Sequence, residues 1–302
     1  MLFTAAIHLE HLGKRYGRVT ALRDVSLEVR QGEVFGFLGL NGAGKTTTIR
    51  IMLDLVRPTG GRAAVFGADC QTHSRDVRAR VGYLPGELGF YGDMTGEATL
   101  DLLGRLGGSP VDPARRRDLL DRLELATSDL RRRMREYSTG MKRKLGIVQA
   151  FQGDPPLLVL DEPTEGLDPL MQDVFYSLVA ETRKRGRTIF MSSHVLPEVE
   201  RVCDRIGLLR DGQLVLSATV DEMRGLAGRR VRVSFRVDVE APPALPDCEV
   251  MEAGPRLWDL RVRGTIAPLV ARLGALPVAD LDVQMPHLEE ILKRYYAPER
   301  RS

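Results

Sequence analysis

The sequence predicts an α/β fold over residues 1–218, followed by a small α+β domain over residues 219–302. Three patterns support this prediction. A short apolar segment at residues 33–38 runs directly into a glycine-rich loop and then into a helical pattern. Residues 157–160 are all apolar, which is typical of a strand buried in a parallel sheet. Residues 231–239 alternate apolar and polar side chains, as a strand with one buried face does.

The composition is that of a globular protein with an ample core. Of the 302 residues, 43% are hydrophobic, and 44 basic residues stand against 41 acidic ones, for a net charge of +3. This weak basic bias is not typical of a nucleic-acid binder, so no nucleic-acid partner is expected. No apolar run approaches the roughly 20 residues of a membrane-spanning helix, and the N-terminus does not resemble a signal peptide. We therefore expect a cytoplasmic protein.

The first motif with clear chemistry is the glycine-rich loop that follows the strand predicted at residues 33–38. Glycines allow backbone N–H groups to turn inward, and the helix N-terminus that follows favours phosphate. We expect Lys45 to reach the terminal phosphates of a nucleotide and the Thr46 hydroxyl to bind Mg²⁺. The flanking strand and helix favour a nucleoside triphosphate site over a purely structural turn. The residues expected to contact the nucleotide here are Gly39, Leu40, Asn41, Gly42, Ala43, Gly44, Lys45, Thr46 and Thr47.

A second motif lies at the end of the predicted buried strand 157–160, which is followed by Asp161 and Glu162. An acid at the end of a strand beside a phosphate loop is well placed to hold Mg²⁺, so we predict Asp161 as a metal ligand. Glu162 should point the opposite way and orient an attacking water. A charged turn without function is the alternative, and the phosphate loop upstream makes it the weaker one.

Together with three further motifs, these segments resemble the nucleotide-binding subunits of ATP-binding-cassette (ABC) transporters. The phosphate loop GLNGAGKTT and the acidic motif LLVLDEPT occur in the family's order. Between them, the signature segment YSTGMKRKL at 137–145 resembles the family's LSGGQ motif. After them come the D-loop EGLD, with Asp168, and SSH, with His194. Upstream, Tyr16 in KRYGRVTAL matches the aromatic residue that stacks on adenine. The resemblance covers roughly residues 7–218.

This resemblance implies a P-loop NTPase ABC cassette with a RecA-like core, an antiparallel β part and a helical subdomain at about residues 87–153. It implies ATP and Mg²⁺ as cofactors, with Lys45, Glu162 and His194 as catalytic residues. His194 would sense the γ-phosphate. Ser138, which also reads locally as the N-cap of a helix over 141–151, would close with Gly140 over the nucleotide of a second, identical subunit. Asp168 would line the same site.

The resemblance also implies a separate partner in the membrane. The expected partners are a second cassette, in a homodimer, and an integral membrane permease that holds the protein at the inner face of the cell membrane. The C-terminal residues resemble the extension of single-cassette exporters, a group that includes antibiotic and drug exporters, so export is expected. A soluble ABC ATPase acting on ribosomes or DNA is the alternative. It is disfavoured because the chain has neither a second phosphate loop nor sustained heptads.

Two departures from the family pattern affect the predicted site. Thr139 and Met141 differ from the signature, and the extra methyl and hydroxyl of Thr139, where glycine is usual, are compatible with weaker or slower closure. Gly86 stands where the family has a glutamine that meets both Mg²⁺ and the permease. Either Glu87 replaces this side chain or a water fills the gap. We favour the water, because neighbouring residues in an extended segment point to opposite sides.

Local signals predict several further elements. Asp112-Pro113 should begin a helix, and Asp211-Gly212 should turn a hairpin over residues 205–216. In the C-terminal domain, we expect a hairpin at 248–264 that turns at Gly254-Pro255. A helix near 266–274, a strand near 278–284 and a final helix at 286–296 should complete it.

Overall fold

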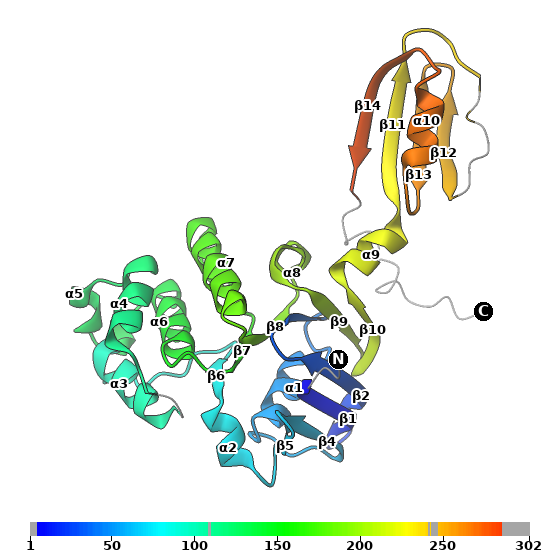
Figure 1. Cartoon of the computed structure of the whole chain (residues 1–302). Helices are drawn as coiled ribbons and strands as arrows, with labels where there is room; N and C mark the ends of the chain where they lie inside the picture. Colours follow the sequence, from blue (N-terminus) through cyan, green and yellow to red (C-terminus); the bar gives the residue numbers. More distant parts are fainter. Residues whose placement is uncertain (1–4, 108–109, 241, 243–246, 286–302) are drawn as a thin grey trace. The chain divides into compact units, whose positions relative to one another are not determined.

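The computed structural model describes residues 5–107, 110–240, 242 and 247–285. The chain divides into two compact units, Met1–Ser217 and Ala218–Ser302, each of which is described by itself (Figure 1). Within the described residues, no helix combines the length and apolar character that crossing a bilayer requires.

The first unit is built on a sheet that is ten-stranded in the described part of the chain. Its central strands pair in parallel, and the strands at one side pair antiparallel, which confirms the predicted RecA-like core and antiparallel β part. From edge to edge the order is β5 (Ala68–Asp69), β4 (Gly60–Val65), β1 (Ala5–Tyr16), β2 (Val19–Arg30), β10 (Gln213–Thr219), β9 (Arg205–Arg210), β3 (Val34–Leu38), β8 (Thr188–Ser193), β7 (Leu157–Asp161) and β6 (Val81–Leu84).

The parallel strands are buried on both faces, which explains their continuous apolar sequences. Every residue of β3, β7 and β8 is buried. Phe190 of β8 packs on Phe35 and Phe37 of β3, with ring centroids 5.8 and 5.3 Å apart. Because β3, β7 and β8 pair in parallel, their carboxyl ends lie at the same edge of the sheet. Ligands of open α/β sheets bind at this edge.

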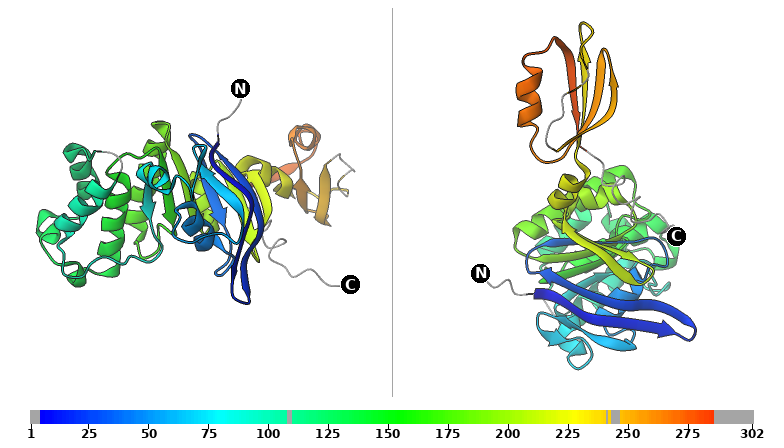
Figure 2. Two further views of the ribbon diagram at one scale, coloured as in Figure 1. Left: turned by 90° about the horizontal axis from the view of Figure 1, so that it is seen from below. Right: turned by 90° about the vertical axis from the view of Figure 1, so that its right-hand side faces the viewer.

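Helices lie on both sides of this core. The helical insertion, which we define as the helices between β6 and β7, lies on the side of the parallel strands opposite to β1, β2 and β4 (Figures 1 and 2). It contains α3 (Gly96–Leu106), α4 (Pro113–Arg122), α5 (Thr127–Leu130), the 3-10 helix η1 (Met134–Glu136) and α6 (Thr139–Phe151). The other helices of this unit are α1 (Lys45–Met52), α2 (Ser74–Ala79), α7 (Pro169–Lys184) and α8 (Leu196–Val202).

Two arginines of α4 connect the insertion to the core. Arg115 pairs at 3.0 Å with Asp154, which lies between α6 and β7, and also donates a hydrogen bond within the insertion to the Phe151 carbonyl at 2.9 Å. Arg122 binds both carboxylate oxygens of Glu181 on α7, each at 2.8 Å. Bidentate pairs of this kind hold two elements in one geometry.

The local turn and capping signals are confirmed. Asp112 caps α4, its carboxylate accepting the Ala114 N–H, and Pro113 is the first helical residue. Asp211 and Gly212 join β9 and β10 with positive φ values of 49° and 76°, as a two-residue hairpin turn requires.

The second unit is a four-stranded sheet in its described residues, with α10 (Ala267–Leu273) on one face (Figure 2). Its order is β12 (Cys248–Gly254), β13 (Leu257–Val262), β11 (Arg229–Phe235) and β14 (Val278–Gln284), and α9 (Val220–Ala227) precedes it. Trp258 and Phe235 pack at 4.6 Å in the core beside Leu269 and Leu273 of the helix. The small α+β fold is as predicted, and the expected helix at 286–296 lies outside the described residues.

Two predicted boundaries in this unit were wrong. The alternating pattern suggested a strand through residue 239, but β11 ends at Phe235. Both partner strands begin opposite this end, since Ser234 pairs with Leu257 and Phe235 with Val278. The hairpin turns at Pro255 and Arg256, because Gly254 still pairs with Leu257.

Candidate functional site

The phosphate loop joins the carboxyl end of β3 to the N-terminus of α1. Two of its glycines are required by close backbone approach. A Cβ atom at Gly44, whose φ is 111°, would lie 2.7 Å from the Ala21 carbonyl oxygen, and one at Gly39 would lie 2.7 Å from that of Leu209. The loop forms the wall of a pocket of about 230 Å³. This pocket is lined by Ala21, Leu40, Asn41, Gly42, Gly44, Lys45, Thr46, Thr47 and Glu162.

Lys45 provides a buried positive charge in this pocket. Its Nζ donates to the Gly39 carbonyl at 2.6 Å and lies 3.1 Å from Oε1 of Glu162. A buried ammonium needs such partners, because desolvation of an unpaired charge is costly. Lys45 is therefore held facing the space that the loop encloses.

Asp161 lies at the end of β7 and is almost completely buried. The Thr46 hydroxyl donates to its Oδ2 at 2.9 Å, and the Ser192 hydroxyl donates to Oδ1. Carboxylate and hydroxyl oxygens are the ligands that Mg²⁺ prefers, and Mg²⁺ sites take most remaining ligands from phosphate and water. Thr46 and Asp161 thus fit the predicted metal site. No cluster of three or more His, Cys, Asp or Glu side chains suited to a metal occurs in the described parts of the chain.

Ser192 was not predicted from the sequence. Besides Asp161, its hydroxyl contacts the Glu162 N–H, which it accepts at 3.1 Å. Ser192 is fully buried on β8, beside β7. Its position two residues before His194, directly after the apolar run Ile189–Met191, was the available signal.

Glu162 adopts a left-handed backbone conformation, with φ of 49°, directly after β7 ends. Its carboxylate lies between two cations or potential cations: Oε1 faces Lys45, and Oε2 is 2.8 Å from Nδ1 of His194. Asp161 faces Thr46 and Ser192, whereas Glu162 faces Lys45 and His194. The two neighbouring acids therefore have separate partners.

The remaining predicted residues lie elsewhere on the first unit, and none of them lines the phosphate-loop pocket. Ser138 and Asp168 are exposed N-caps of α6 and α7, accepting the N–H groups of Met141 at 3.2 Å and Met171 at 3.0 Å. Gly140 faces the Gly166 carbonyl, which a Cβ would approach to 3.2 Å. Tyr16, at the end of β1, is 46% exposed, and Nζ of Lys14 lies 4.8 Å from its ring centroid.

Gly86 lies next to Asp161. A Cβ atom at Gly86 would be 3.4 Å from Asp161 Oδ2, an ordinary van der Waals distance. A glutamine side chain at this position would therefore begin beside the Asp161 carboxylate. Glu87 is exposed. The segment therefore borders the predicted metal site without placing a side chain of its own in it at position 86.

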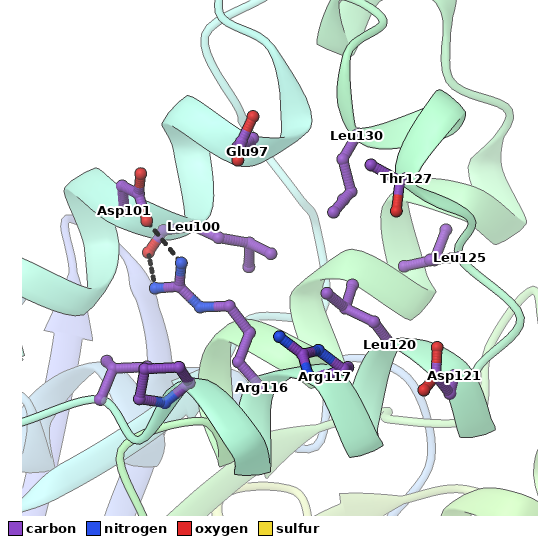
Figure 3. Close-up of a pocket in the computed structure, with 12 residues that line it drawn as sticks. Glu97, Leu100, Asp101, Arg116, Arg117, Leu120, Asp121, Leu125, Thr127 and Leu130 are labelled. Atoms are coloured by element: carbon purple, nitrogen blue, oxygen red, sulfur yellow. Dashed lines mark hydrogen bonds and ion pairs between the residues drawn. The ribbon is translucent and has the colours of Figure 1, made fainter.

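A larger pocket, of about 470 Å³, lies within the helical insertion (Figure 3). Leucines form much of its wall, and Arg116 pairs with Asp101 at its edge. No residue with a predicted role lines it, so its size does not make it the nucleotide site. It is lined by Glu97, Leu100, Asp101, Val111, Pro113, Arg116, Arg117, Leu120, Asp121, Leu125, Thr127 and Leu130.

Comparison with known proteins assigns the family. A family model described as ABC transporter matches residues 22–165. The bacitracin transport ATP-binding protein BcrA of Enterococcus faecalis is 37% identical over 88% of this chain and 84% of its own length. The daunorubicin resistance ATP-binding protein DrrA3 of Streptomyces coeruleorubidus is 34% identical over 91% and 84%. An uncharacterized ABC transporter ATP-binding protein of Nostoc is 42% identical over 69% of this chain, and the match spans only 62% of that relative.

A solved ATP-binding subunit of an ABC transporter gives the same assignment. It superposes with a TM-score of 0.67 at 32% identity, over 72% of this chain and 92% of its own. None of these proteins supports the alternative of action on ribosomes or DNA. On its sequence, its fold and the geometry of its phosphate loop, the chain belongs to the ATP-binding subunits of ABC transporters.

Proposed function

We propose that this chain is the ATPase subunit of an exporter, and that it works as a homodimer on a separate membrane permease. The observation that supports hydrolysis is the convergence of five side chains at the carboxyl edge of β3, β7 and β8. These side chains are Lys45, Thr46, Asp161, Glu162 and His194. Export is supported by the similarity to the bacitracin transport and daunorubicin resistance proteins. The transported compound follows from the permease, which makes the substrate contacts in this family.

In this proposal each acid has one role. Thr46 and Asp161 would hold Mg²⁺, which when bound neutralises charge on the phosphate oxygens. Ser192 fixes the orientation of the Asp161 carboxylate. Glu162 accepts the proton of the attacking water, and Lys45 binds the terminal phosphates. Since Glu162 contacts both Lys45 and His194, an incoming γ-phosphate would compete with it for both side chains.

The residues outside the pocket support a shared site. Ser138 and Gly140 lie at the exposed N-terminus of α6, which has 13 residues and so offers a full set of helix-end N–H groups. We propose that this end binds the γ-phosphate held by the loop of a second subunit. Asp168, exposed at the start of α7, would line the same interface, and Tyr16 would stack on adenine in place of its contact with Lys14.

The proposal is tested with the full chain, alone and co-purified with its membrane partner. Phosphate release from ATP should require Mg²⁺ and stop on chelation with EDTA. In proteoliposomes containing the permease, ATP supplied on the subunit's side should drive a compound out of that compartment. If neither preparation hydrolyses ATP in the presence of Mg²⁺, the proposal that the chain is an ATPase is wrong. Recovery of the chain with ribosomes, and with no membrane protein, would support the alternative instead.

Replacement of Glu87 by alanine tests what stands in for the family's glutamine. We expect basal ATP hydrolysis to stay within about twofold of wild type, because Glu87 is exposed and a water can complete Mg²⁺ hydration. Stimulation of hydrolysis by the permease should fall if Glu87 contacts it. Steady-state phosphate release, with and without permease, measures both effects. A loss of basal hydrolysis as large as that of Glu162→Gln would show that Glu87 is the working replacement.

A further inference from the structure

We propose that Arg143 is a positioning residue that ties the signature helix α6 to the Gly86 segment and to the loop after Glu162. Its hydrogen bonds to backbone carbonyls fix the position of a segment that, with glycine at residue 86, has no side chain there to contact the metal site. The inference rests on the proposed function, since the parts that Arg143 connects border the site assigned to Mg²⁺ and the attacking water.

The contacts of Arg143 join three parts of the chain. The side chain is 6% exposed and lies on the second turn of α6. Nη2 donates to the Gly86 carbonyl at 2.7 Å, Nη1 to the Pro85 carbonyl at 3.0 Å, and Nε to the Glu165 carbonyl at 3.0 Å. A guanidinium has five N–H groups in a rigid planar fork, so it can hold two separate backbone segments in one geometry.

The two segments are those that border the reacting groups. Pro85 and Gly86 follow β6, which ends at Leu84, and Gly86 lies against Asp161 Oδ2. Glu165 lies three residues after Glu162, and its N–H donates to the Glu162 carbonyl at 3.2 Å. The Arg143 guanidinium therefore holds two backbone segments: the one beside Asp161 and the one that follows Glu162.

Burial makes these contacts consequential. Desolvation lowers the pKa of Arg143, while the carboxylates of Glu165, Asp161 and Glu162 act against this shift. A guanidinium taken out of water needs hydrogen-bond acceptors, and here one backbone carbonyl accepts from each of its three nitrogens. Loss of the side chain would leave those carbonyls without this donor and free both segments to move.

The same helix begins with the residues proposed to meet the second nucleotide. Ser138 and Gly140 lie five and three residues before Arg143, and Gly140 packs near the Gly166 carbonyl. A shift of α6 on closure of the dimer would thus move the Arg143 fork, and with it the Gly86 and Glu165 carbonyls. Contact of α6 with the nucleotide bound by the second subunit would thus be transmitted to the Mg²⁺ site of the subunit to which α6 belongs.

Hydrogen–deuterium exchange on the full-length chain tests the geometry without relying on activity. In Arg143→Met, amides of residues 86–88 and 165–167 should exchange about tenfold faster than in wild type. Arg143→Lys, which keeps the charge but not the fork, should give an intermediate rate. The matched control is Arg115→Met, which removes another largely buried arginine of the insertion bound to a backbone carbonyl. It should leave both segments unchanged.

The second readout is the Mg²⁺ concentration that gives half-maximal ATP hydrolysis. It should rise about tenfold in Arg143→Met, and remain within twofold of wild type in Arg115→Met, while nucleotide affinity in EDTA stays unchanged. Wild-type exchange rates at both segments in Arg143→Met would overturn the inference, whatever the activity. If wild type itself hydrolyses no ATP, the proposed function fails, and the exchange data still decide whether Arg143 positions these segments.

Discussion

Replacement of Glu162 by glutamine is expected to lower ATP turnover by about 10²- to 10⁴-fold while ATP remains bound. Glutamine keeps the size of the side chain and can still accept a hydrogen bond from Lys45, which lies 3.1 Å from the carboxylate. It cannot take a proton from the attacking water. Because ATP persists, the variant should form a stable ATP-dependent dimer. Phosphate release and size-exclusion chromatography with ATP measure the two effects.

The control for this experiment is Glu181→Gln, the same chemical change in a glutamate that pairs with Arg122 on α4. It should hydrolyse ATP at near the wild-type rate. Near-normal turnover in Glu162→Gln would remove the role assigned to Glu162 and leave the pocket as a binding site alone.

A mixture of Lys45→Ala and Ser138→Arg chains should recover activity that neither variant has by itself. In a two-fold symmetric dimer with shared sites, each homodimer has both sites broken. A hybrid dimer has one site with both changes and one with neither. Random 1:1 mixing gives hybrids in half of the dimers, so activity should reach about a quarter of wild type if the sites act independently.

The structure offers a matched mixture that should stay inactive. Lys45 and Glu162 contact each other within one chain. A hybrid of Lys45→Ala and Glu162→Gln therefore breaks each site once, and no intact site forms. Activity in this control equal to that of the first mixture, no recovery in the first mixture, or full hydrolysis by a monomer would each exclude the shared site.

The parts of the site that the sequence predicted are those with local signals. A loop that follows a strand and starts a helix, two acids that end a strand, and the Asp112-Pro113 cap all depend on neighbours in the chain. The contacts of Ser192 and Arg143 depend instead on residues far away in the sequence. Ser192 reaches Asp161 because β8 pairs with β7, and Arg143 reaches Gly86 because α6 packs beside the end of β6.

The misplaced boundaries have the same cause. The alternation of residues 231–239 is real, but a strand continues only as far as its partners do. β11 stops at Phe235 because β13 and β14 begin at Leu257 and Val278. Which residues would face each other across the sheet depends on a register that one sequence does not state.

The left-handed backbone of Glu162 sets the requirements of turnover against those of folding. For a residue with a Cβ this conformation is disfavoured by about 1 kcal/mol, whereas glycine adopts it freely. Glu162→Gly would relieve this strain but leave the buried Lys45 without the partner that lies 3.1 Å away, whereas Glu162→Gln keeps a hydrogen-bond acceptor there. The residue that holds this strained conformation is therefore the one to which we assign proton transfer, and backbone strain of this kind clusters at functional sites.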